Sequence, residues 1–426
     1  MKEIKFNIPY GKGSLDFSLP RSRLLGVLKN RGSRPGDIRS LLSSVFRKIP
    51  GEDEIEGLAI GKNVLIVVPD ATRSAHLRQI LPYLISKIGK VSRTIDIIIA
   101  TGLHKKHTRG QLKELLGGSI VRKYRILQHD QNVGSLADLG STDDGIPVIL
   151  NRNLFSHDLV ISIGVIEPHL YAGYSGGIKT VSIGLAGERT VNYTHGVKFL
   201  DDKMTRIGSV KGNPFQDALW KISGGINIGF SVNVVNDPDG EAVGLFAGDT
   251  KRVFAKGVKA SRRIFAVEAE IQADIVICGV GFPKDINLYQ ASRAINYVVN
   301  TDRPVIKRGG VIIIAAELKD GIGKSPSEIR FYDKLREMLS PEDFIINTKL
   351  KGCVVGEHRA YMVAKPLIDY KIAFVNTGKH AFAHGLPFPF FKRISAALKY
   401  ADSIAGQRSL IYIIPRALST IASVRP

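Results

Sequence analysis

The sequence predicts an α/β fold built from doubly wound parallel sheets in two domains. Short, continuously apolar and β-branched runs alternate with segments of helical spacing, and such runs are typical of strands buried on both faces of a parallel sheet. Polar clusters follow several of these runs directly, where open α/β sheets bind their ligands. The 426 residues suffice for two or three domains, since single cores rarely grow beyond about 250–300 residues.

Seven apolar runs are the predicted strands: Val64–Val68, Ile97–Ala100, Leu159–Ile163, Ile275–Val280, Val311–Ala315, Ile372–Val375 and Leu410–Ile414. The first three are expected to share one sheet. The pattern restarts near Ala273 after a predicted helix and connector over residues 250–272, which indicates a second α/β domain. The predicted boundaries are therefore 1–268 for the N-terminal domain and 269–402 for the C-terminal domain, with a segment 403–426 that could return to the first domain.

Composition narrows the classes of partner. The net charge of +21 favours an anionic partner, but the basic residues are spread along the chain and form no nucleic-acid-binding motif. We therefore expect small anionic ligands and no nucleic acid. No apolar run approaches the about 20 residues that span a bilayer, so we expect a cytoplasmic protein without a membrane partner. Two cysteines cannot form a disulfide framework, and Cys278 is expected to be a small buried hydrophobe.

Polar clusters follow four of the predicted strands, at Pro69–Arg73, Thr101–His104, Gly164–His169 and Gly281–Asp285. The carboxyl ends of parallel strands lie at one edge of a sheet, near the point where the strand order reverses. The clusters are therefore expected to converge in a crevice.

A glycine-rich segment precedes Lys179. Glycines let backbone N–H groups approach an anion closely. The segment nearly matches the Walker A pattern, but Ile178 stands where that pattern has its second glycine, which argues against an ATP-type loop. An anion-binding loop and a flexible surface loop both remain open. The candidate cofactor-binding residues are Gly173, Ser175, Gly176, Gly177 and Lys179.

Three histidines are candidates for chemistry. His104 and His169 each follow a predicted strand, and His195 closes the glycine-rich segment. Imidazole is the commonest metal ligand and suits proton transfer near neutral pH. His104 and His107 also form an H-x-x-H pair that could bind zinc, although the basic residues around it oppose a second cation.

Two further groups are candidates for substrate binding. Arg73 at a predicted helix start could hold a carboxylate, with Asp70 as its orienting partner; a simple helix cap beside a surface arginine is the alternative. Tyr289 or Gln290 and Arg293 would share one face of a helix that could face the first domain, and an ordinary solvated face is the alternative.

Four segments together resemble the nickel-dependent lactate racemase family: PDATR at 69–73, ATGLH at 100–104, EPHLYAGYSGGIKTVSIGLAGERTVNYTH at 167–195 and NLYQASR at 287–293. The resemblance covers residues 5–415, and the long third segment is the specific one. It implies two Rossmann-like domains with an interdomain active-site cleft. It also implies a nickel-pincer nucleotide, a pyridinium mononucleotide whose sulfur-containing arms hold nickel.

The resemblance also implies roles for the candidate residues. Lys179 matches the lysine that carries the cofactor through a thioamide, and His195 matches the histidine ligand of nickel. His104 and His169 match the acid and base, Arg73 matches the arginine that binds substrate carboxylate with Asp70 beside it, and Tyr289 and Gln290 match residues that face the substrate.

The implied reaction inverts C2 of a 2-hydroxy acid, as a racemase or epimerase, by hydride transfer to the tethered cofactor. The family usually has arginine at position 178 and often lysine at position 293, so Ile178 and Arg293 point to a substrate larger or more anionic than lactate. The alternatives are a dehydrogenase or lyase on the same scaffold and a non-catalytic nucleotide- or anion-binding protein. Enzymes that build the cofactor are implied partners, and the oligomeric state is left open.

Overall fold

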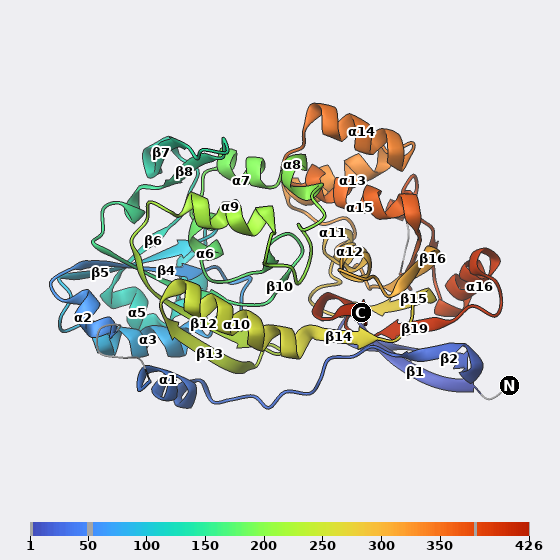
Figure 1. The fold of residues 1–426 in the computed structure, drawn as a ribbon, viewed down its shortest axis with the longest axis horizontal. Helices are drawn as coiled ribbons and strands as arrows, with labels where there is room; N and C mark the ends of the chain where they lie inside the picture. The colour runs from blue at the N-terminus through green and yellow to red at the C-terminus, as the bar shows by residue number, and fades with distance from the viewer. Residues whose placement is uncertain (1–2, 49–53, 379–380, 426) are drawn as a thin grey trace. The chain divides into compact units, whose positions relative to one another are not determined.

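The computed structural model describes residues 3–48, 54–378 and 381–425, and it divides into two compact units. The first unit comprises residues 32–194 and 209–264, and the second comprises residues 1–31, 195–208 and 265–426. Each unit contains a largely or wholly parallel sheet with helices packed on it (Figure 1). The prediction of an α/β fold with parallel sheets is therefore confirmed.

The sheet of the first unit has the strand order β13-β12-β9-β4-β5-β6, in which only β13 is antiparallel to its neighbour. These strands are β4 (Asn63–Pro69), β5 (Thr94–Ala100), β6 (Arg125–Gln128), β9 (Leu159–Val165), β12 (Ile228–Asn236) and β13 (Ala242–Gly248). The helices are α1 (Ile38–Phe46), α2 (Ile55–Ala59), α3 (Leu77–Ile88), α4 (Arg109–Leu116), α5 (Gly118–Lys123), α6 (Lys179–Ser182), α7 (Glu188–Thr194), α9 (Pro214–Ile222) and α10 (Thr250–Phe265). Two small hairpins complete the unit: β7 (Leu136–Ser141) with β8 (Pro147–Asn151), and β10 (Pro168–His169) with β11 (Gly173–Tyr174).

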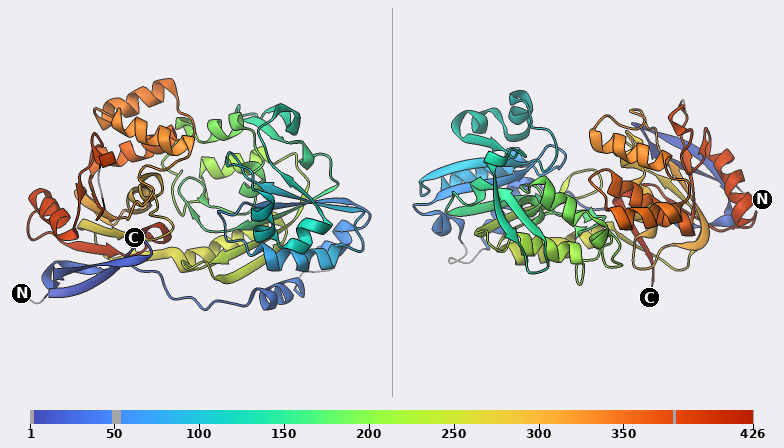
Figure 2. Two further views of the ribbon diagram at one scale, coloured as in Figure 1. Left: turned by 180° about the vertical axis from the view of Figure 1, so that it is seen from behind. Right: turned by 90° about the horizontal axis from the view of Figure 1, so that it is seen from above.

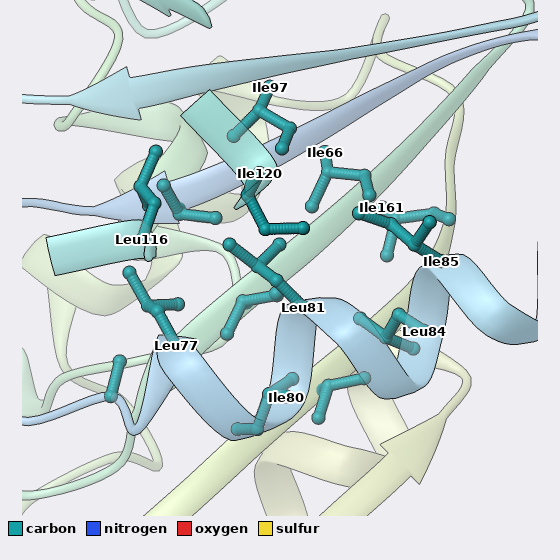
Figure 3. Packing of buried hydrophobic residues seen from close by; sticks show 14 of the residues in the cluster. Ile66, Leu77, Ile80, Leu81, Leu84, Ile85, Ile97, Leu116, Ile120 and Ile161 are labelled. Atoms are coloured by element: carbon teal, nitrogen blue, oxygen red, sulfur yellow. The ribbon is translucent and has the colours of Figure 1, made fainter. Parts of the chain in front are cut away.

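The central strands of this sheet are buried on both faces, as the continuous apolar runs predicted. In β4 every residue from Val64 to Pro69 is buried. On one face, Ile66, Ile97 and Ile161 pack against Leu81 and its neighbours on α3 (Figure 3). Burial of each such side chain contributes about 1.5–3 kcal/mol, so this core fixes where the strand ends lie.

The sheet of the second unit is wholly parallel, with the order β18-β17-β16-β15-β19-β3. Its strands are β3 (Leu24–Val27), β15 (Ala273–Gly279), β16 (Ile306–Ala315), β17 (Lys371–Val375), β18 (Phe390–Phe391) and β19 (Ile411–Ile414). Its other strands are β1 (Glu3–Tyr10), β2 (Gly13–Pro20), β14 (Ala266–Ala269) and β20 (Ile421–Val424). Its helices are α8 (Val197–Leu200), α11 (Leu288–Ala291), α12 (Arg293–Val299), α13 (Pro326–Arg336), α14 (Pro341–Lys351), α15 (Glu357–Asp369) and α16 (Ile394–Ala405).

The observed division differs from the predicted boundaries in three segments, and the main junction falls after residue 264 instead of residue 268. Residues 1–31 and 195–208 belong to the second unit, and the segment 403–426 stays there instead of returning to the first. The cause is long-range strand pairing: β19 pairs with both β15 and β3, and β20 pairs with β14. Figure 2 shows the N-terminal strands in blue beside the C-terminal elements in red. Such pairing joins the two ends of the chain and leaves no local trace in sequence.

Two smaller expectations concern single residues and membrane spans. Cys278 is fully buried in β15, as expected for a small hydrophobe, and burial raises the pKa of its thiol far above the usual range. Among the described residues, no helix is both long enough and apolar enough to cross a bilayer.

Candidate functional site

The first unit has its switch point between β4 and β9. The chain runs from β4 outward to β5 and β6, then returns to β9 on the other side of β4. Ligands of open α/β sheets bind beyond the carboxyl ends of the strands at such a point. The loops that follow β4, β5 and β9 here are the predicted polar clusters, and contacts between side chains of these loops build the site.

Asp70 is the buried centre of this group. It follows β4 directly, and its Oδ1 accepts hydrogen bonds from the backbone N–H and the hydroxyl of Thr72. Its Oδ2 lies 2.7 Å from Nδ1 of His104 in the loop after β5. Burial alone would raise the pKa of Asp70, but the hydrogen bonds from His104 and Thr72 hold this pKa below its ordinary value. Asp70 is therefore ionised at neutral pH and accepts a hydrogen bond from His104.

This contact defines the tautomer of His104. A carboxylate only accepts hydrogen bonds, so Nδ1 of His104 carries the proton. The lone pair of the neutral ring is then on Nε2, and 65% of the side chain is exposed to solvent. An imidazole held in this way can accept a proton at Nε2, and the charge that forms is stabilised by Asp70.

Arg73 is paired with Glu167, a carboxylate that is not among the predicted site residues. Its Nη1 donates to Oε1 of Glu167, which follows β9. The pair joins the two strand ends at the switch point. Both side chains are about one-third exposed, so a ligand carboxylate can reach the guanidinium beside Glu167. The signal for Glu167 was its position at a strand end, the same signal that identified Asp70 and His104.

The amine of Lys179 interacts electrostatically with Arg73, Glu167 and Asp70. Burial of the amine and the positive charge of Arg73 lower its pKa to about 8, and the charges of Glu167 and Asp70 oppose the shift. A larger fraction of the amine is therefore neutral near pH 8 than for an ordinary lysine with a pKa of about 10.4. Neutral amine is the nucleophilic form, and a lysine is activated in this way by desolvation next to another cation.

The reactivity of Lys179 should follow this pKa. When the cofactor-free chain is acetylated, the rate at Lys179 should level off above a midpoint at about pH 8. Lys334 is the control, because its hydrogen bond with Glu337 raises its pKa above the ordinary value for a lysine. Glu167→Gln removes a charge that opposes the shift and should move the Lys179 midpoint to lower pH. Peptide mass spectrometry measures both rates, and identical midpoints for the two lysines would contradict this account.

His169 is held in a different way from His104. It lies in the short strand β10, and its Nδ1 accepts hydrogen bonds from the backbone N–H groups of Tyr171 (3.2 Å) and Ala172 (3.1 Å). The neutral ring therefore carries its proton on Nε2. Rings of Tyr171 and Phe215 lie against it, with centroids 5.7 and 6.3 Å away. The two candidate acid/base histidines thus have opposite tautomers.

The glycines of the predicted anion loop are required by packing of the chain itself. Gly173 has φ of +72°, and a Cβ there would lie 1.8 Å from the carbonyl oxygen of Ser209. Gly177 has φ of +49°, and a Cβ there would lie 2.9 Å from the ring of Phe254. Protein atoms, and not a ligand, fill the space that a side chain at Gly173 or Gly177 would need.

The amides of this loop are also largely engaged. The N–H groups of Ser175, Gly177 and Lys179 donate to Glu167 O, Asn233 Oδ1 and Gly176 O, at 2.8, 2.8 and 2.9 Å. The hydroxyl of Ser175 donates to the carbonyl oxygen of Val165 at 2.8 Å. These groups hold the loop on β9 and β12, and a phosphate would have to displace these bonds to bind there.

Gly173→Ala tests the packing explanation. Because the added methyl group would overlap backbone atoms and the backbone has positive φ, we expect a loss of about 3 kcal/mol or more in the free energy of unfolding. Gly225→Ala is the matched control, since no atom lies within 4 Å of a Cβ at that position, and it should change stability by less than about 0.5 kcal/mol. Urea denaturation measures both. Equal stabilities would show that Gly173 has another role.

The second unit brings together the other predicted substrate residues. Tyr289 and Gln290 lie on α11, and Arg293 begins α12. The helix is interrupted between them, yet Nη1 of Arg293 donates to Oε1 of Gln290 at 2.8 Å. Tyr289 packs edge-on against Phe331, with ring centroids 5.3 Å apart. Gln290 thus orients the guanidinium of Arg293.

His195 also belongs to the second unit, where its ring meets that of a second histidine. The ring of His358 lies edge-on to it, with centroids 5.5 Å apart. His358 is buried, and its Nδ1 accepts a hydrogen bond from the N–H of Gly356. Burial, followed by the charges of His195 and Arg359, lowers the pKa of His358 well below its ordinary value. His358 was not predicted, because no local motif marks it.

The structure thus places the predicted residues in two groups. Asp70, Arg73, His104 and Lys179 form one group in the first unit, with His169 on the same unit. His195 and the group of Tyr289, Gln290 and Arg293 belong to the second unit.

Comparison with known proteins identifies the family. The family model described as "Lactate racemase N-terminal domain" matches residues 10–208, and the model described as "Lactate racemase C-terminal domain" matches residues 268–422. Lactate racemase from Thermoanaerobacterium thermosaccharolyticum is 31% identical over 97% of this chain and 98% of its own. Lactate racemase from Lactiplantibacillus plantarum is 28% identical over 98% of this chain and 99% of its own.

Solved structures agree with these matches. The lactate racemase apoprotein from T. thermosaccharolyticum has a TM-score of 0.90 at 30% identity, covering 99% of this chain and 100% of its own. A protein from Thermotoga maritima shares the fold, with a TM-score of 0.69 at 18% identity over 93% of this chain and 100% of its own. The chain therefore belongs to the lactate racemase family and is an isomerase.

Proposed function

We propose that this chain inverts C2 of a 2-hydroxy acid with the help of a nickel-pincer nucleotide bound covalently to Lys179. The observation that carries the proposal is the group at the switch point of the first unit. There an imidazole oriented by Asp70 and a guanidinium paired with Glu167 lie near an amine of lowered pKa, Lys179, whose charge interacts with both carboxylates.

The residues fit the proposed cofactor in two respects. The lowered pKa of Lys179 favours the neutral amine that attachment requires. Among residues 3–48, 54–378 and 381–425, no group of three or more His, Cys, Asp or Glu side chains is arranged to hold a metal ion. In this proposal the nucleotide supplies most donors to nickel, and His195 would supply the protein ligand. When bound, the cofactor supplies an acceptor for the C2 hydrogen of the substrate.

The residues of the first unit account for the other steps. Arg73 binds the substrate carboxylate in place of part of its contact with Glu167. His104 accepts the hydroxyl proton at Nε2 while Asp70 stabilises the charged ring. His169 presents an N–H at Nε2 and donates a hydrogen bond to substrate oxygen. When hydride returns to the opposite face of the planar 2-keto acid, His169 would give its Nε2 proton to the oxygen, and the other isomer of the hydroxy acid forms.

Arg293 directs the choice of substrate in this proposal. Its guanidinium is planar and forked, and Gln290 fixes one edge of it at 2.8 Å. A forked cation binds a second carboxylate of a substrate better than it binds the methyl group of lactate. We therefore propose a substrate that is more anionic than lactate. We also propose that separate enzymes build the cofactor.

A chiral assay tests the proposal. The holoenzyme, purified from a host that makes the cofactor, should convert either isomer of a 2-hydroxy acid to an equal mixture, with a dicarboxylic substrate turned over faster than lactate. Chiral chromatography measures the isomers. Absence of inversion for every 2-hydroxy acid, in protein whose mass shows the adduct, would refute the proposed reaction.

A further inference from the structure

The second histidine of the H-x-x-H pair has a defined place that the proposed reaction does not use. Nε2 of His107 lies 3.3 Å from the backbone N–H of Ala71 and accepts its hydrogen bond. Ala71 directly follows Asp70, whose carboxylate holds His104. The loop after β5 therefore meets the loop after β4 at two points, once through each histidine.

His107 is itself anchored to the next strand. Its backbone N–H donates to Oε1 of Gln128, the last residue of β6, at 2.7 Å, and its carbonyl oxygen accepts from Nε2 of Gln128 at 3.0 Å. Both main-chain polar groups of His107 are thus fixed by one side chain. The resulting chain of contacts, Gln128 to His107 to Ala71, crosses the carboxyl ends of three neighbouring strands, β6, β5 and β4.

The ring of His107 suggests a role other than stability. Because Nε2 accepts a hydrogen bond, the neutral ring carries its proton on Nδ1, and that atom is buried without a hydrogen-bond partner. A buried N–H without a partner costs free energy and calls for an explanation. The contact also engages the Nε2 lone pair of His107, so the H-x-x-H pair does not offer two free nitrogens to zinc.

We propose that His107 is a positioning residue for His104. It fixes Ala71, and the fixed backbone keeps the Asp70 carboxylate 2.7 Å from Nδ1 of His104. The tautomer that leaves Nε2 of His104 ready to accept a proton depends on this arrangement. The inference rests on the proposed function where it names His104 as the base, whereas the contacts themselves do not depend on it.

Two substitutions at one position test the role. In His107→Gln, the side-chain oxygen lies three bonds from Cβ, as Nε2 does, and can accept the Ala71 hydrogen bond. His107→Leu removes this acceptor together with the unpaired buried N–H, so the fold should persist. In holoenzyme, His107→Leu should lower kcat for racemisation about tenfold or more, because small misplacement of a catalytic group has effects of this size. KM should change less than twofold, and His107→Gln should restore most of kcat.

A second readout does not require activity. In the full-length chain without cofactor, His107→Leu should speed hydrogen exchange at the Ala71 amide and weaken the ¹⁵N-coupled Nδ1–H signal of His104, and His107→Gln should preserve both. Gln128→Ala should also speed exchange at the Ala71 amide and weaken the His104 signal, because it removes the other end of this chain of contacts. Unchanged exchange and an unchanged His104 signal in His107→Leu would overturn the proposal. If these signals change but the wild-type enzyme inverts no hydroxy acid, the proposed function fails and the positioning role stands.

Discussion

Lys179→Arg is expected to yield a folded protein that carries no covalent adduct and has no measurable racemase activity. Arginine keeps a positive charge beside Glu167 and Asp70, so the electrostatic surroundings change little. A guanidinium stays protonated and cannot act as the attached nucleophile. Enzymes supply rate accelerations of about 10⁶-fold or more, and here the acceptor of the C2 hydrogen would be missing.

Intact-protein mass spectrometry of wild type and variant, produced in the same cofactor-making host, measures the adduct. Lys221→Arg is the matched control, because Lys221 is an exposed lysine paired with Asp144. It should keep both the adduct and the activity. An adduct of unchanged mass on Lys179→Arg would show that the cofactor is attached elsewhere or not covalently bound.

His104→Gln is expected to lower kcat by about 10²- to 10⁴-fold, the usual contribution of general acid–base catalysis, while the adduct on Lys179 is retained. Glutamine can still hydrogen-bond to Asp70 but cannot accept and release a proton at neutral pH. Because the His104 side chain is 65% exposed, the substitution should leave thermal stability almost unchanged. Asp70→Asn should lower kcat in the same range, since an amide can stabilise the wrong tautomer of His104.

The chain provides a matched histidine–aspartate pair for comparison. Nε2 of His157 lies 3.3 Å from Oδ2 of Asp96, at the amino-terminal edge of the same sheet. His157→Gln should change stability and leave kcat within about twofold, because this edge does not carry the ligand site of such a sheet. If both substitutions lowered kcat equally, the loss would reflect the fold and not proton transfer by His104.

Much of the fold could be predicted because buried parallel strands require continuous apolar runs. All seven predicted strands are present, as β4, β5, β9, β15, β16, β17 and β19. The strand β12 was missed because Ser231 and Asn233 interrupt its apolar pattern. Both are buried; the hydroxyl of Ser231 hydrogen-bonds to that of Thr250 at 2.7 Å, and Oδ1 of Asn233 accepts from the N–H of Gly177 at 2.8 Å.

The candidate site could be predicted only in part. Strand ends marked Asp70, Arg73 and His104, since topology alone brings such ends together. The sequence could not show whether Gly173 makes room for a ligand or for the backbone of Ser209. A glycine indicates that a side chain would not fit, but it does not indicate which atoms fill the space. The place of His107 was likewise hidden, since its partner is a main-chain N–H that no side-chain pattern reveals.

The fate of the C2 hydrogen tests the central claim most directly. The holoenzyme is incubated with one isomer of a 2-hydroxy acid that carries deuterium at C2, and chiral chromatography with mass spectrometry follows isomer and label together. The proposed reaction predicts an equal mixture of isomers that retains most of its deuterium, with no build-up of keto acid. Inversion accompanied by loss of the label to water, or steady accumulation of keto acid, would contradict it.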